Sequence, residues 1–187
     1  LYVRWLKRFP ALISLFCLLC VSACRVSVNH DLVDHSQRHR SESHRYTLSA
    51  GQSIGQTFVA QHGGLKGVDF WLIPDGESSG TLRFSLRSGP ESGGNIRTAE
   101  LPLSEIPESA STHFVFKPLR SSHSAYYYGV ITFEGEGSLE VGAGPGETYL
   151  QGALYYEQEP QDAQAVFHLT YDFLWAFADL MEAIARW

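Results

Sequence analysis

The chain has 187 residues, of which 44% are hydrophobic and 18% charged, and its formal net charge at pH 7 is −6. This length and composition predict one globular domain whose apolar residues can form a core without disulfide bonds. The acidic balance excludes the basic surface that nucleic-acid binding needs, because neutralising phosphates supplies most of that affinity, and it excludes charge-driven binding to anionic lipid headgroups.

The N-terminus has the charge-then-apolar order of a secretory signal. Arg4, Lys7 and Arg8 form a cationic start, and an apolar stretch covers residues 10–23. Val21-Ser22-Ala23-Cys24 closes this stretch and resembles a lipobox, the site that lipoprotein signal peptidase cleaves before the cysteine is acylated. We therefore predict a signal peptide over residues 1–23, lipidation of Cys24, and a membrane-anchored, extracytoplasmic location in the bacterial cell envelope.

Two alternatives to a lipoprotein signal remain open. The N-terminal segment could stay as an uncleaved anchor, or it could be an ordinary cleaved signal. The apolar stretch offers about 14 residues before Arg25, fewer than the roughly 20 that a spanning helix needs, so cleavage fits the sequence better.

Residues 24–45 are rich in histidine, arginine, serine and acidic residues and poor in apolar ones, which predicts a flexible, solvated tether. His35 and His39 have the spacing that would place two metal ligands on one face of a helix. Arg38 and Arg40 lie between and beside them and would repel a cation. We therefore expect neither a metal nor a cofactor.

From residue 46 to residue 171 the sequence predicts strands. Leu82, Phe84 and Leu86, for example, alternate with polar residues, which is typical of a sheet with one buried face. Turn residues rich in glycine and proline separate such runs and predict an all-β domain, an antiparallel β-sandwich (jelly roll). The expected strands are 46–50, 55–60, 66–73, 81–87, 97–102, 113–117, 125–133, 138–142, 149–156 and 164–171.

The last segment, residues 172–187, predicts a short amphipathic helix that Asp172 could cap. Asp172, Asp179, Glu182 and Arg186 form one polar stripe, and the other positions are almost all apolar. The helix could pack against the open end of the sandwich, lie in a membrane interface, or dock on a partner. The sequence leaves these three alternatives open.

The sequence contains one motif that is typical of serine hydrolases. Residues 51–55 spell G-x-S-x-G, but a nucleophile elbow needs a strand before Ser53 and a helix after it. Here the residues after Ser53 continue as a strand, so a turn between two strands is the better interpretation. We expect that the protein is not an enzyme and has no catalytic residues.

The domain resembles the carbohydrate-binding-module-like jelly rolls of bacterial envelope proteins over roughly residues 46–171. The segments that carry the resemblance are Gly55-Gln56-Thr57-Phe58, Gly64-Leu65-Lys66-Gly67-Val68, residues 80–87, residues 114–119, Tyr126-Tyr127-Tyr128-Gly129-Val130, and Tyr149 with Gly152 and Tyr155. The resemblance implies a binding module and transfers no catalytic residue.

Four aromatic residues are predicted to face outward and to bind carbohydrate, namely Trp71, Tyr126, Tyr128 and Tyr155, because flat rings on a rigid sheet can stack on sugar faces. They could instead cover a second apolar layer or pack under the helix. The sequence thus predicts an envelope-tethered, non-enzymatic binding or accessory module with a glycan as the leading ligand. The alternative is a structural subunit that docks on a membrane protein complex through its C-terminal helix, without binding sugar.

Overall fold

The computed structural model describes residues 31–37, 44–106 and 110–185. The predicted signal peptide, the lipidation site Cys24 and residues 24–30 and 38–43 of the predicted tether lie outside this part of the chain. The strands are β1 (Leu32–Gln37), β2 (Arg45–Ser49), β3 (Ser53–Val59), β4 (Leu65–Pro74), β5 (Ser79–Arg87), β6 (Arg97–Pro102), β7 (Ala110–Leu119), β8 (Tyr126–Glu136), β9 (Ser138–Pro145), β10 (Leu154–Tyr156), β11 (Glu159–Gln161), β12 (Ala163–Ala165) and β13 (Phe167–Tyr171). The helices are η1 (Leu103–Glu105), η2 (Gly146–Thr148) and α3 (Phe173–Ala185).

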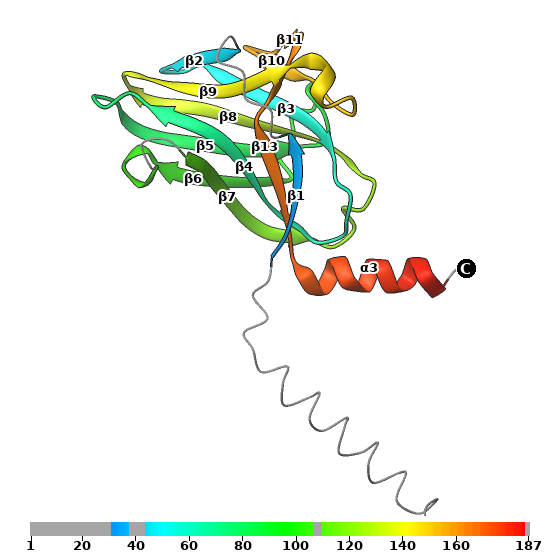
Figure 1. The fold of residues 1–187 in the computed structure, drawn as a ribbon. Coiled ribbons are helices and arrows are strands. Elements are labelled where there is room, and N and C mark those ends of the chain that lie inside the picture. Colours follow the sequence, from blue (N-terminus) through cyan, green and yellow to red (C-terminus); the bar gives the residue numbers. More distant parts are fainter. Residues whose placement is uncertain (1–30, 38–43, 107–109, 186–187) are drawn as a thin grey trace, which may run out of the picture. The chain divides into compact units, whose positions relative to one another are not determined.

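The strands form two antiparallel sheets, and one helix follows them (Figure 1). One sheet has seven strands in the order β1-β13-β4-β9-β12, with β2 paired to β9 and β7 paired to β4. The other has six strands in the order β11-β10-β3-β8-β5-β6. The predicted β-sandwich with a C-terminal helix is confirmed.

The core lies between the two sheets and follows from the period-two alternation of the strands. On β5, Phe84 is fully buried, whereas its neighbour Arg83 is exposed. Phe70 of the seven-stranded sheet meets Phe84 of the six-stranded sheet at a ring-centroid separation of 6.3 Å. Phe58 meets Phe167 in the same way at 5.8 Å, so aromatic rings join the sheets at two places.

Two buried glutamine side chains also link the sheets. Gln56 on β3 donates from Nε2 to Oε1 of Gln164 on β12 over 2.6 Å, and the amide N of Ala165 donates to Gln56 Oε1 over 2.8 Å. Gln164 Nε2 in turn donates to the carbonyl oxygen of Gly152 over 2.8 Å. Because both amide groups are buried and hydrogen-bonded, they fix the register between the layers at little desolvation cost.

The structure differs from the sequence prediction before residue 46 and within residues 149–171. Glu159–Gln161 forms a strand, β11, that the sequence does not predict, and the strand predicted over 164–171 is two strands, β12 and β13. Leu32–Gln37, inside the predicted tether, forms β1 and pairs with β13, which offers it a free sheet edge. The strand predicted over 149–156 is limited to Leu154–Tyr156. The chain before it is a loop that stays bonded to β3, because the amide N of Ala153 donates to Thr57 Oγ1 over 2.7 Å and the amide N of Thr57 donates to the Ala153 carbonyl over 3.0 Å.

Helix α3 begins where the sequence predicts it. The carboxylate of Asp172 accepts hydrogen bonds from the amide N of Leu174 at 3.1 Å and of Trp175 at 3.4 Å, which is N-cap geometry. The helix has 13 residues. In the described ranges, no helix has the length and apolar character needed to cross a bilayer.

Candidate functional site

Three of the four predicted aromatic residues lie on the outer face of the six-stranded sheet. Tyr126 and Tyr128 alternate on β8 with Tyr127, which points into the core. Tyr155 lies on β10, whose partner strand β3 also pairs with β8. The register brings Tyr155 and Tyr128 together across β3, because Tyr155 pairs with Gly55 and Tyr128 pairs with Thr57, two residues further along the same strand. We call this group, with the pocket beside it, the tyrosine site.

The ring of Tyr128 lies flat across the backbone of Gly55. A Cβ atom at position 55 would fall 2.3 Å from Tyr128 Cε2, so only glycine leaves room for the ring there. On its other side Tyr128 meets Tyr155 edge-on, with centroids 5.4 Å apart and planes at 70°. The two rings therefore form a fixed corner on the sheet surface rather than two independent side chains.

The three tyrosines differ in exposure. Tyr126 is 45% exposed, Tyr155 is half-buried, and Tyr128 is only 3% exposed. The buried ring of Tyr128 therefore lines the site, whereas the rings of Tyr126 and Tyr155 are accessible from solvent. Burial raises the pKa of Tyr128 to about 12, although the nearby Arg87 opposes this shift, so its hydroxyl keeps its proton at neutral pH. Burial, together with Tyr126 and Glu91, also raises the pKa of Tyr155.

A pocket of about 190 Å³ lies beside Tyr128. Arg87 and Glu91 supply opposite charges to its lining, and Asn95 Oδ1 holds Arg87 by accepting from its Nε over 2.9 Å. The other lining residues are Gly51, Ser53, Pro90, Val130, Thr132 and Gln158. The volume is below the roughly 300–1,000 Å³ of small-molecule pockets, so a ligand would lie across the surface and insert only one group.

The turn between β10 and β11 forms one rim of this pocket and has an uncommon backbone. Glu157 and Gln158 have φ values of 51° and 69°, in the left-handed region that favours glycine. The turn is fixed to the start of β3, because the amide N of Ser53 donates to Glu157 Oε1 over 2.5 Å. Tyr156 pairs with Glu159, so Glu157 and Gln158 form a two-residue hairpin turn, and the turn places Gln158 at the pocket.

The fourth predicted residue, Trp71, is not part of this group. It lies on β4 in the seven-stranded sheet, where its indole ring packs against Gly142 and is only partly exposed. The structure therefore brings Tyr126, Tyr128 and Tyr155 together and leaves Trp71 on the other sheet.

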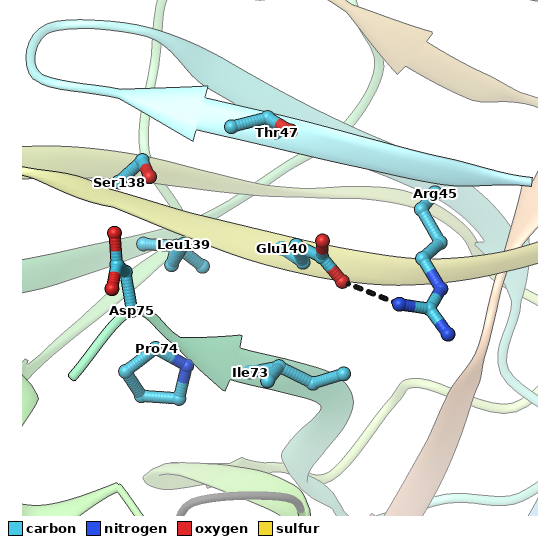
Figure 2. A pocket seen from close by; sticks show the side chains of 8 residues that line it. All are labelled: Arg45, Thr47, Ile73, Pro74, Asp75, Ser138, Leu139 and Glu140. Atoms are coloured by element: carbon cyan, nitrogen blue, oxygen red, sulfur yellow. Dashed lines mark hydrogen bonds and ion pairs between the residues drawn. The ribbon is translucent and has the colours of Figure 1, made fainter.

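A larger pocket, of about 340 Å³, lies on the seven-stranded sheet between β2, β9 and β4 (Figure 2). Arg45 and Glu140 lie side by side in its lining and form an ion pair of 2.9 Å. The rest of the lining is Thr47, Ile73, Pro74, Asp75, Ser138 and Leu139. None of these described lining residues is aromatic, and the two charges already neutralise each other, so this pocket suits a sugar less well than the tyrosine site.

The other candidate chemistry of the sequence is placed as follows. The G-x-S-x-G segment is a turn, in which the amide N of Gln52 donates to the Ser49 carbonyl over 3.0 Å, and Ser53 begins strand β3. Within residues 31–37, 44–106 and 110–185, no three His, Cys, Asp or Glu residues are grouped so that they could hold a metal ion.

Sequence reasoning missed the polar half of the tyrosine site. Arg87 was assigned only to the polar face of its strand, and Glu91 and Gln158 fall in turns without any distinguishing motif. A weak signal was present, because Arg87 precedes the Ser88-Gly89-Pro90 turn and so lies at the end of a strand. Nothing local in the sequence shows that Gln158 lines the same pocket.

Comparisons with known proteins add little to this geometry. No family model and no curated protein matches the chain. Among solved structures, the chain is similar to TmCBM61 in complex with β-1,4-galactotriose, with 17% sequence identity and a TM-score of 0.34, over 68% of this chain and 82% of that one. A likeness at this TM-score carries no argument about a ligand, and the fold rests on the strand pairing described above.

Proposed function

We propose that this protein is a non-enzymatic glycan-binding module, built on a jelly-roll-type sandwich and tethered to the bacterial cell envelope through Cys24. The observation that carries the proposal is the gathering of Tyr126, Tyr128 and Tyr155 on one sheet face beside Arg87 and Glu91. Exposed aromatic faces next to polar side chains are what a sugar ring needs, since it has apolar C–H faces and hydroxyl edges.

The charges of the site favour sugar hydroxyls over an ionic ligand. Arg87 donates hydrogen bonds and the Glu91 carboxylate accepts them, so together they match hydroxyl groups, which do both. Among the described lining residues, Glu91 is the one carboxylate. Glycoside hydrolysis ordinarily uses two, which supports binding without cleavage.

A glycan array probed with the full chain tests the proposal. We expect binding to a defined set of glycans, and weakening on the order of tenfold or more in the Tyr126→Ala/Tyr155→Ala double variant, because each ring contributes about 1 kcal/mol. The matched control is Val115→Ala, which removes an exposed side chain from β7 of the other sheet. Binding to no glycan, or equal binding by the double variant, would refute the glycan site.

The anchoring half of the proposal has its own test. The lipobox-like residues before Cys24 predict that the protein takes up a radiolabelled fatty acid in a bacterial host. We expect Cys24→Ser to abolish this labelling, with Cys20→Ser as the matched control. Labelling that persists in Cys24→Ser would show that this cysteine is not the acylation site.

One observation favours a second function, that of a structural subunit docking through α3. Most of the large exposed apolar side chains of the described chain lie on this helix rather than on a sheet. A subunit of this kind would be recovered with a membrane complex and would bind no glycan on the array.

A further inference from the structure

Helix α3 contacts the domain through the side that carries Trp175, Ala176 and Asp179. Asp179 Oδ2 pairs with Nδ1 of His123 at 2.5 Å and accepts from the amide N of Gly63 at 3.3 Å. Trp175 stacks under the guanidinium of Arg120, with Cζ 4.1 Å from the ring centroid, and Ala176 is buried. An amphipathic helix on a soluble domain normally turns its apolar side inward, so the orientation here is the reverse of the usual one.

The opposite side of α3 is an exposed apolar stripe. Its side chains are between 42% and 67% exposed, and they follow the i, i+3, i+4, i+7 spacing of one helix face. They are Phe173, Leu174, Phe177, Leu180, Met181 and Ile184. Fully burying such a side chain stabilises by roughly 1.5–3 kcal/mol, and a continuous exposed patch of this kind marks an interaction surface.

The stripe lies at the end of the domain where the chain arrives from its N-terminal segment. β1 is antiparallel to β13, with Leu32 opposite Tyr171, two residues before α3 begins (Figure 1). Leu32 and Val33 at this end of β1 are themselves exposed.

Chain length sets how far this end can be from an anchor at Cys24. The seven residues from Arg25 to Asp31 span at most about 25 Å when fully extended. The 13 residues of α3 are about 20 Å long, so the helix would stay within roughly its own length of the bilayer surface.

We propose that α3 lies in the interface of the bilayer that holds the N-terminal anchor, with its apolar stripe in the boundary between headgroups and acyl chains. This inference rests on the anchoring half of the proposed function. A helix of this length and amphipathicity lies in the membrane plane and does not span it. Its acidic Asp179 faces the domain and is paired there, so binding depends on apolar burial and needs no anionic lipid.

The test uses the full chain reconstituted with phosphatidylcholine vesicles. A fluorescent amino acid replaces Phe177 by codon suppression, and a matched chain carries it at Thr47, an exposed residue of β2 at the end of the domain away from α3. Spin-labelled phosphatidylcholine then reports contact with lipid. We expect the label at position 177 to lose fluorescence, equally with and without phosphatidylserine, and the label at position 47 to keep it.

A second pair of chains shows whether the apolar stripe causes the contact. Leu174→Glu/Leu180→Glu should restore the fluorescence of the label at 177 without changing the unfolding transition, since both side chains are exposed. Ala178→Glu, an exposed position beside the stripe, should leave the quenching in place.

Three results would overturn the proposal, and they separate it from the anchoring hypothesis. A chain that sediments with vesicles but is not quenched at 177 is anchored without α3 in lipid. A label at 177 that is shielded only when other envelope proteins are present indicates a protein partner for the stripe. A chain that does not sediment with vesicles removes the anchoring premise and the inference together.

Discussion

The aromatic ring of Tyr128 occupies the space that a side chain at Gly55 would fill, with only 2.3 Å between Tyr128 Cε2 and a Cβ atom at position 55. The tyrosine site therefore depends on a residue that has no side chain. A side chain added at position 55 would therefore disturb the site by displacing the Tyr128 ring.

We predict that Gly55→Ala destabilises the domain by about 1–3 kcal/mol, because the Tyr128 ring must leave its position and strain its neighbours. Denaturant unfolding measures this, and glycan binding should weaken as the corner with Tyr155 is lost. Gly76→Ala is the control, since a Cβ atom there meets nothing within 4 Å. Equal unfolding midpoints for the two variants would contradict the close packing of the Tyr128 ring against Gly55.

A histidine–carboxylate pair on the other sheet predicts a pH-dependent contribution to stability. His113 on β7 lies opposite Asp69 on β4 and pairs with its carboxylate. The hydrogen bond to Asp69 raises the pKa of His113, against an opposing effect of burial, and charges on Asp69 and Asp31 add to the rise.

Because the folded-state pKa of His113 is raised, the pair stabilises the fold fully below the unfolded value of about 6.5, and the contribution is lost as pH rises through the folded-state pKa. We expect the loss of unfolding free energy in Asp69→Asn to be larger at pH 5.5 than at pH 8.5. In a His113→Gln background the same substitution should cost an amount that no longer depends on pH. A pH-independent cost in the parent chain would refute this linkage.

The buried glutamine link predicts a cost for removing one amide. Gln56→Leu leaves the amide N of Ala165 and Oε1 of Gln164 without their partner, and a buried unsatisfied group costs about 1–3 kcal/mol. Chemical denaturation of Gln56→Leu, Gln164→Leu and the double variant measures the coupling. Gln151→Leu, on an exposed loop, should change stability by no more than about 0.5 kcal/mol. Additive costs for Gln56 and Gln164 would mean that the two side chains do not act as one link.

Removing the Asp172 N-cap should destabilise α3 without destabilising the strands. Asp172→Ala removes the acceptor for the amides of Leu174 and Trp175 and should cost the helix about 1 kcal/mol. Hydrogen exchange should speed up at these amides and through the first turn, while the strands keep their protection. Asp75→Ala, in an exposed turn, is the control. Unchanged exchange at Leu174 would show that the cap does not hold the helix.

Period-two alternation was enough to predict the sandwich and the outward side of β8. Tyr127 shares its parity with Ile131 and Phe133, so Tyr126 and Tyr128 had to face the other way. The same rule places Trp71 on the side of β4 opposite Phe70 and Leu72, but it says nothing about which sheet a strand joins. The separation of Trp71 from the tyrosines follows from strand pairing, which the local pattern does not specify.

Local sequence patterns also do not predict the burial of Tyr128 or the orientation of α3. Tyr128 faces outward, yet Tyr155 and Gly55 allow it to lie flat and be covered, which depends on two strands distant in sequence. For α3, the stripe of acids was visible, but its direction depends on His123 and the amide of Gly63, which hold Asp179 against the domain. The usual preference of apolar faces for the core therefore does not predict the orientation of this helix.

The antiparallel pairing of β1 with β13 also has a mechanical consequence. A load applied at Asp31 would run along β1, and Leu32, Val33 and Asp34 would have to slide past β13 together, because their bonds lie across the direction of pull. Such a shear arrangement resists force better than bonds that open one at a time. A domain held in this way keeps its fold while the chain before it is under tension.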